Sequence, residues 1–276
     1  MACKTILAVL QNEADAARVL RLAVPLAASE GAHLVGLHAR ALPLPPATPM
    51  GMPDIGYIEA AEEAATELAG RIRAVFDAAA AAEGVSSEWR SMETTAGDSA
   101  AAALESARCA DLVVAGQSDP QHAATDLAAL LFHGGRPVLF VPYAGTFRLP
   151  FRKALVAWNG TAESARAAFD ALPFLVAAES VEVLTVDAPT DQRQDAISSG
   201  AEIAAALSRH GVRLTLTDMK SGPLTAGQSI QNHVAETGAD LLVTGAWSTS
   251  RLKEFFFGGV TRTILASMTC PTLMSR

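Results

Sequence analysis

The chain is poor in cysteine, in clustered basic residues and in long apolar runs. Cys3, Cys109 and Cys270 are odd in number and far apart, which indicates neither a disulfide framework nor a CxxC metal or redox site, so they are interpreted as small buried hydrophobic residues. No Lys/Arg cluster stands out and the formal net charge is −8, which argues against nucleic acid and anionic membranes as partners. Because no apolar run of about 18 residues and no signal-peptide layout occurs, we expect a cytoplasmic protein that does not cross a membrane.

The common enzyme signatures are missing as well. The sequence contains no GxxxxGK[ST] phosphate loop, no GxGxxG turn, no GxSxG elbow and no HExxH pair. Its six histidines fall at no metal-ligand spacing, so structural or surface roles are expected for them. Asp187, Asp191 and Asp195 follow a predicted strand, where a solvated loop explains them as well as catalysis does. We therefore predict neither a catalytic residue nor a metal site.

The chain is long enough for two domains, and it repeats itself. It has 276 residues, of which 50% are hydrophobic and 18% charged; this excludes intrinsic disorder, and two halves of about 140 residues could each bury a core. Residues 4–9 resemble residues 153–158, and residues 110–116 resemble residues 239–245. The sequence therefore predicts two similar domains, 1–145 and 151–276, joined by a short proline-bounded linker.

The two matches differ in offset, 149 residues for the first pair and 129 for the second. About 20 extra residues must therefore lie in the first half, and the segment 41–57, with five prolines and two glycines, accounts for them. Such a composition permits neither a helix nor a central strand. We expect a long surface loop there, either a plain excursion or a lid over a site.

Within each half, short apolar runs rich in β-formers alternate with longer alanine-rich amphipathic runs. This alternation is typical of βαβ units around a parallel sheet. Helical spacing of apolar residues predicts one long helix over 57–82. The strands of the second half are predicted at 154–158, 181–186, 213–218, 240–245 and 271–274. The fold class is therefore α/β, with two consecutive doubly wound five-stranded parallel-sheet domains.

One region of the second half has the pattern of an anion site. Gly245 ends a strand, and Gly258 with Gly259 opens a helix running towards Ala266, whose first backbone N–H groups could approach an anion closely. The turn 159–161 (Asn-Gly-Thr) follows the first strand of the same half. In a doubly wound sheet these two loops border one crevice. The alternative is a plain strand-to-helix turn with Thr161 as N-cap, and a helix break at the glycine pair.

The tandem halves, the Asn-Gly-Thr turn and the run from Gly245 to Thr261 resemble the universal stress protein family in its two-domain form. Nucleotide-binding members of that family carry a Gly-x2-Gly-x9-Gly-Ser/Thr pattern after strand four. Here Gly245 and Gly258 match the first and third glycines, whereas Ser248 stands at the second glycine and Gly259 at the Ser/Thr. The resemblance implies α/β/α sandwiches of the adenine-nucleotide α-hydrolase-like type, related by a pseudo-twofold axis.

The resemblance also implies a ligand, ATP or another adenine nucleotide with or without Mg²⁺, bound by the second half. In the first half the turn 11–13 and the stretch after Gly116 lack the family's motifs, so its site is interpreted as degenerate. Asn159, Gly160 and Thr161 would lie at the nucleoside and phosphates, Val186 at the adenine edge and Arg251 within reach of a phosphate oxygen. The phosphates would be lined by Gly245, Ala246, Ser248, Gly258, Gly259, Val260 and Thr261.

By the same resemblance, the last strands of the halves, 138–141 and 272–274, should meet and form an intramolecular pseudo-dimer, to which a second copy of the chain could add. The function implied is that of a stress-response protein that binds or senses adenine nucleotides and acts through an unidentified protein partner. The alternative is a scaffold of the same family whose two sites have both decayed. A third hypothesis is an enzyme that uses the crevice for adenylation; Ser248 and Gly259 favour the scaffold over the enzyme.

Overall fold

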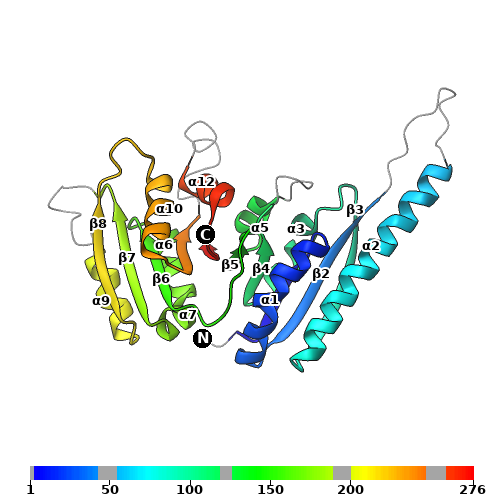
Figure 1. The fold of residues 1–276 in the computed structure, drawn as a ribbon, viewed down its shortest axis with the longest axis horizontal. Coiled ribbons are helices and arrows are strands. Elements are labelled where there is room, and N and C mark those ends of the chain that lie inside the picture. The colour runs from blue at the N-terminus through cyan, green and yellow to red at the C-terminus, as the bar shows by residue number, and fades with distance from the viewer. Residues whose placement is uncertain (1–2, 43–54, 119–125, 189–199, 247–258) are drawn as a thin grey trace. The chain divides into compact units, whose positions relative to one another are not determined.

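A computed structural model describes residues 3–42, 55–118, 126–188, 200–246 and 259–276 (Figure 1). They fold into helices and parallel strands that alternate along the chain, so the predicted α/β class is confirmed. The chain divides into two compact units, one formed by Cys3–Gly134 and the other by Gly135–Arg276. Within the described ranges, no helix is both long and apolar enough to cross a membrane.

The first unit is a parallel sheet in the order β3-β2-β1-β4. Its strands are β1 (Thr5–Val9), β2 (His33–Ala41), β3 (Ser87–Thr94) and β4 (Leu112–Gly116). Its helices are α1 (Glu13–Glu30), α2 (Ile55–Ala82), α3 (Ser99–Ala102), α4 (Leu104–Arg108) and α5 (Leu127–His133). Strand β4 is buried throughout, as expected for a parallel strand covered on both faces.

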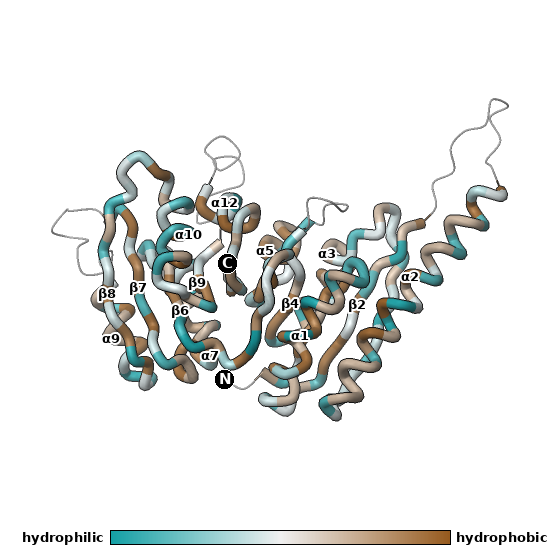
Figure 2. The backbone as a smooth tube through the Cα atoms, in the orientation of Figure 1, coloured by the Kyte–Doolittle hydropathy of each residue, from teal (hydrophilic) through white to brown (hydrophobic). Residues whose placement is uncertain are grey.

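The long helix α2 follows the predicted range closely and is amphipathic. Hydrophobic and hydrophilic residues alternate with its turns (Figure 2). Phe76 is fully buried against Gly36 of β2, where a Cβ atom would lie 2.6 Å from the ring, and its ring centroid is 5.5 Å from that of Trp89. Gly36 therefore lets an aromatic side chain lie directly on the strand, which fixes α2 on the sheet.

The second unit has the strand order β5-β10-β9-β6-β7-β8. Strand β5 is antiparallel to β10, and the other pairs are parallel. Its strands are β5 (Val138–Val141), β6 (Lys153–Trp158), β7 (Ser180–Val186), β8 (Leu214–Met219), β9 (Leu241–Gly245) and β10 (Thr272–Ser275). The helices are α6 (Ala162–Asp170), α7 (Leu172–Ala177), α9 (Ala201–Arg209), α10 (Ala226–Thr237) and α12 (Val260–Ser267).

These bounds confirm most of the elements that periodicity predicts. The five strands of the second half appear within two residues of the expected positions. The last strands also meet as expected, since Leu139 of β5 pairs with Leu273 of β10. The pseudo-twofold relation and the domain limits 1–145 and 151–276 stay predictions.

Two predictions need correction. The expected loop 41–57 is too wide, because Ala41 is the last residue of β2 and residues 55–57 form the first turn of α2; its centre, 43–54, lies outside the described residues. The cysteines are not uniformly buried. Cys270 is buried, which raises the pKa of its thiol to about 12, and Cys3 is partly buried, but Cys109 is exposed at the end of α4.

Candidate functional site

The order of the strands places the switch point of the second unit between β6 and β9. The chain runs from β6 outward through β7 to β8, then returns to β9 and β10 on the other side. Ala157 of β6 pairs with Thr244 of β9, so the two strands end side by side. The loops after β6 and β9 therefore leave adjacent strands at the carboxyl edge of the sheet, where ligands bind in open α/β sheets.

The turn after β6 is held by its own side chains. Thr161 is the N-cap of α6, and its Oγ1 accepts a hydrogen bond from the Ser164 backbone N–H at 3.3 Å, which is the alternative role considered for this turn. Thr161 also donates to Oδ1 of Asn159, from its hydroxyl at 2.8 Å and its backbone N–H at 3.3 Å. Gly160 between them has φ 75°, a value that favours glycine. Because the Asn159 oxygen is engaged, its exposed amide group can offer N–H donors.

Gly245 and Ala246, at the end of β9, are held by close packing and by a backbone hydrogen bond. A Cβ atom on Gly245 would lie 2.5 Å from the Ser164 backbone nitrogen and 2.7 Å from the Glu163 carbonyl carbon. The start of α6 thus packs directly on the end of β9, and glycine is needed there whether or not a ligand binds. Ala246 is buried, and its N–H donates to the Ser275 carbonyl at 2.8 Å.

Helix α12 begins as predicted, directly after Gly259. Gly259 is its N-cap, without a side chain that could satisfy the first N–H groups. Val260 is half-buried, and Thr261 is buried at 3% exposure. The first backbone N–H groups of α12 and the positive end of its dipole therefore lie at the same edge of the sheet as the Asn159 turn. Three predicted site residues, Ser248, Arg251 and Gly258, lie outside the described residues.

Val186 ends β7 and is half-buried, and its neighbour Asp187 is the residue that sequence reasoning undervalued. Asp187 has φ 54°, and its carboxylate accepts hydrogen bonds from the backbone N–H of Ser221, at 3.1 Å, and from the Ser221 hydroxyl. These hydrogen bonds lower the pKa of the Asp187 carboxyl. Asp187 therefore links the loop after β7 to the loop after β8 through its side chain. The local sequence signal for this role is the residue type, because aspartate is one of the few residues that tolerate the left-handed region.

The corresponding edge of the first unit is filled by its own side chains. By the offset of 149, Leu10 and Gln11 take the places of Asn159 and Gly160. The Gln11 side chain donates to the Gly97 carbonyl at 2.8 Å and accepts from the Ser99 backbone N–H at 2.9 Å. At the position of Gly160 in the second unit, the first unit therefore has the Gln11 amide, which bonds to the main chain of Gly97 and Ser99.

His38 also forms a hydrogen bond at this edge of the first unit. Thr5 pairs with His33 as Ala154 pairs with Val181, so His38 takes the place of Val186. It is 3% exposed, its Nδ1 lies 2.9 Å from the Leu10 carbonyl oxygen, and burial lowers its pKa. The hydroxyl of Ser99 donates to the same carbonyl at 3.1 Å. The carbonyl groups of Leu10 and Gly97 and the backbone N–H of Ser99 are thus already hydrogen-bonded at this edge.

The sequence repeat matches Ser229 of α10 with Ser99, but the two do not occupy the same place. Ser99 directly follows the N-cap Asp98 of α3, whereas Ser229 lies four residues after Thr225, the N-cap of α10. Ser229 is 3% exposed, and its hydroxyl has no hydrogen-bond partner in the structure as described. Gly160 and Val186, at the positions of Gln11 and His38, carry no polar side chain. A buried hydroxyl without a partner is uncommon in native proteins. What distinguishes the second edge is therefore that Gly160 and Val186 stand where Gln11 and His38 form hydrogen bonds in the first.

Asp15 of the first unit is buried at 5% exposure at the start of α1. Its carboxylate accepts from the Gln11 backbone N–H at 2.9 Å and contacts the Arg18 guanidinium at 3.2 Å. It lies on Gly116, where a Cβ atom would be 1.6 Å from Oδ1. Burial raises the pKa of Asp15. The folded state thus holds this proton more tightly than the unfolded chain does, and that contribution to stability is lost as pH rises through the raised pKa.

Asp15→Asn cannot titrate, so we expect its free energy of unfolding, relative to wild type, to increase as the pH is raised from about 4 to about 7. Urea unfolding of both proteins at several pH values measures this difference. A difference that is constant or that falls over the range would contradict the raised pKa.

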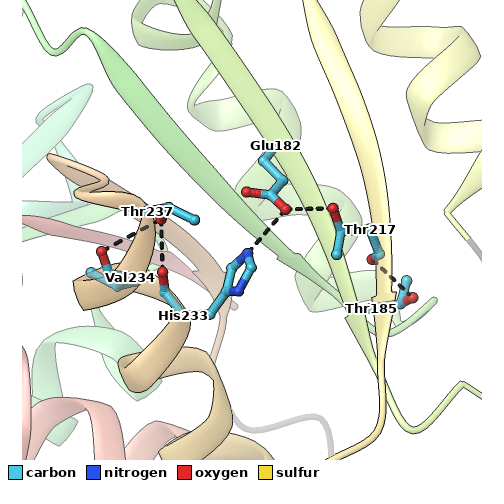
Figure 3. A network of polar contacts seen from close by, with 6 residues as sticks. All are labelled: Glu182, Thr185, Thr217, His233, Val234 and Thr237. Atoms are coloured by element: carbon cyan, nitrogen blue, oxygen red, sulfur yellow. Dashed lines mark hydrogen bonds and ion pairs between the residues drawn. The ribbon is translucent and has the colours of Figure 1, made fainter.

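A polar cluster of the second unit lies between α10 and the sheet (Figure 3). His233 Nε2 is 3.0 Å from Oε1 of Glu182 in β7, and Thr217 of β8 donates its hydroxyl to the same oxygen. Glu182 precedes the end of β7 by four residues, so the cluster lies away from the candidate site. It ties α10 to two strands, in line with the structural roles expected for the histidines. Among the described residues, no three His, Cys, Asp or Glu side chains are grouped to hold a metal ion.

Comparison with known proteins identifies the family of the chain. The model of the universal stress protein family matches residues 2–132 and again 150–276. A universal stress protein from Archaeoglobus fulgidus has a similar structure, with a TM-score of 0.69 and 16% identity, over 100% of this chain and 97% of that one. A functionally unknown protein from Pseudomonas aeruginosa follows, with a TM-score of 0.58 and 16% identity over 99% and 92% of the chains. At such identities the structures show a shared fold only.

No curated protein matches the sequence. The family model nevertheless covers both halves, and a solved structure of the same tandem length shares the fold. The chain therefore belongs to the universal stress protein family, with two of its domains in tandem.

Proposed function

We propose that the second domain binds an adenine nucleotide at the carboxyl edge of β6 and β9, and that the first domain does not. The contrast between the two edges carries this proposal. Side chains of Gln11, His38 and Ser99 bond the first edge internally, whereas the second has Gly160 and Val186 at the positions of Gln11 and His38, and the exposed amide of Asn159. An edge whose polar groups bond to one another has fewer of them left for a ligand than an edge with an exposed amide.

The residues of the second edge suit the parts of a nucleotide. The amide of Asn159, oriented by Thr161, offers a donor to ribose or phosphate oxygens. The start of α12 offers backbone N–H groups and a positive dipole end to phosphate. Val186, half-buried at the end of β7, offers an apolar contact to the adenine ring. Because the chain carries a net charge of −8, these local donors must outweigh the overall field.

The proposal is one of binding or sensing rather than turnover. Mg²⁺ would accompany ATP through the phosphate oxygens, as is usual for a cation that keeps most of its water. Ser248, Arg251, Gly258 and Gly259 belong to the proposed phosphate side by their positions in the sequence motif. An unidentified protein partner would receive the signal of occupancy.

Calorimetric titration with ATP and AMP tests the proposal. Wild type should bind, and Asn159→Ala should weaken binding about tenfold, which corresponds to about 1.4 kcal/mol for a lost donor to a charged group. Asn232→Ala, on the exposed side of α10, serves as the matched control and should leave the affinity for nucleotide unchanged.

Two further variants address the motif itself. Ser248→Gly restores the family's second glycine and should tighten binding, and Gly258→Val should abolish it by placing a branched side chain against the phosphates. If wild type fails to bind and Ser248→Gly gains nothing, the scaffold alternative is favoured instead.

A further inference from the structure

A groove of about 690 Å³ runs between α10 and α12 of the second unit. The two helices lie side by side (Figure 1). They approach closely because Gly227 has no Cβ atom, which would lie only 2.9 Å from Cβ of Thr263. None of the residues proposed above for the nucleotide lines this groove.

The floor of the groove contains a buried amide without partners. Gln231 is 9% exposed, and neither its Nε2 nor its Oε1 forms a hydrogen bond in the structure as described. A buried primary amide offers two donors and an acceptor, and leaving all of them unpaired is costly. A hydrophobic residue of similar volume would avoid that cost. The amide therefore points to a ligand that enters the groove with both a donor and an acceptor.

Two more side-chain amides of α10 line the same groove, on the same face of the helix as Gln231. Gln228, Gln231 and Asn232 stand at i, i+3 and i+4, which places them on one face of the helix. Gln228 and Asn232 are one turn apart, about 6 Å along the helix. In an extended chain, main-chain groups that point to the same side repeat every 6.5–7 Å or so, about the same spacing. Oε1 of Gln228 already accepts hydrogen bonds from the backbone N–H and the hydroxyl of Thr225, so Gln228 offers the groove its N–H donors, while Gln231 offers both donors and an acceptor. A row of amides at this spacing matches the alternating C=O and N–H groups of an extended peptide.

The groove also contains one cation. Arg262, in the first turn of α12, is exposed, and no described residue pairs with its guanidinium. A guanidinium binds a carboxylate through two parallel hydrogen bonds. The α10 residues of the groove, from Gln228 to Ala235, span about 10 Å, the length of three or four extended residues.

We propose that this groove binds an extended acidic peptide segment of a partner protein. The amides of Gln228, Gln231 and Asn232 hold its main chain, and Arg262 pairs with a carboxylate of the segment. This site goes beyond nucleotide binding and does not depend on it. It gives the protein a second surface through which it can recognise another chain.

NMR titration of the full-length protein, without nucleotide, tests the proposal. The probes are acetyl-Ala-Ala-Ala-Glu-amide and acetyl-Glu-Ala-Ala-Ala-amide, with the lysine analogues and a backbone N-methylated form as controls. We expect shift changes along α10 and α12 with at least one glutamate peptide, and at least tenfold weaker binding of the lysine and N-methylated forms.

Gln231→Leu should weaken peptide binding at least tenfold. Its melting temperature should be equal to or higher than that of wild type, because the unpaired amide is removed while volume is kept. Glu236→Ala, on the exposed side of α10 outside the groove, should bind like wild type.

Several outcomes would overturn the proposal. They are equal binding by Gln231→Leu, equal binding of the N-methylated peptide, or no shift changes on α10 and α12 with either glutamate peptide. Shift changes produced by N-methylacetamide and acetate but not by the peptides would assign the groove to small polar molecules instead. ATP binding is measured separately, so neither result decides the other.

Discussion

Replacing Gly245 by alanine is expected to lower the free energy of unfolding of the second domain by about 3 kcal/mol, the upper end of overpacking costs. The added Cβ would lie 2.5 Å from the Ser164 backbone nitrogen and 2.7 Å from the Glu163 carbonyl carbon. Both are main-chain atoms at the start of a helix, so no side-chain rotation can relieve the contact. Helix α6 would have to move off β9, and with it the turn that contains Asn159.

Thermal unfolding followed by circular dichroism measures this effect, which should lower the midpoint of the second domain by roughly 10 °C. Gly70→Ala is the matched control. Gly70 lies in α2, where a Cβ would meet nothing within 4 Å, so alanine should stabilise that helix by up to about 1 kcal/mol. An unchanged midpoint for Gly245→Ala would show that the close approach of α6 to β9 is not part of the fold.

The second large effect is expected from giving the second edge the residues of the first. Val186→His together with Asn159→Leu reproduces the pair His38 and Leu10, in which the imidazole Nδ1 lies 2.9 Å from the Leu10 carbonyl oxygen. The double variant removes the amide donor and fills the adenine edge with a side chain that bonds to the protein. ATP affinity should fall at least a hundredfold, about 2.7 kcal/mol.

The fold should tolerate this change, because the first domain already has the same arrangement. The melting temperature of the double variant without nucleotide should therefore stay within about 2 °C of wild type, a shift of roughly 1 kcal/mol or less. The reference variant is Leu10→Val, which alters the first edge only and should leave ATP affinity unchanged. Retention of ATP binding by the double variant would mean that the nucleotide does not use this edge.

Most of the fold could be predicted from the sequence, because each element has a local cause. The apolar runs before Gly245 and Trp158 fix strands, and the helical spacing of Ile72 and Phe76 fixes α2. The repeat then determines the order of elements in both halves. The edges of the proline-rich segment were misplaced because backbone pairing with Thr94 extends β2 to Ala41.

The candidate site was only partly predictable. The Asn159 turn and the start of α12 follow from motif residues next to strand ends. The structural role of Gly245 does not, because it depends on the approach of α6. The hydrogen bonds of Gln11 and His38 join residues far apart in sequence. No local pattern reports such contacts, and they are what distinguishes the two halves.

The central claim, that only the second domain binds nucleotide, is tested most directly by photolabelling the full-length protein with 8-azido-ATP and mapping the labelled peptides by mass spectrometry. The label sits on the adenine ring, so the account predicts one labelled region in residues 150–276, around Val186, that is lost when excess ATP competes. Label that ATP displaces from residues 3–134 would contradict it.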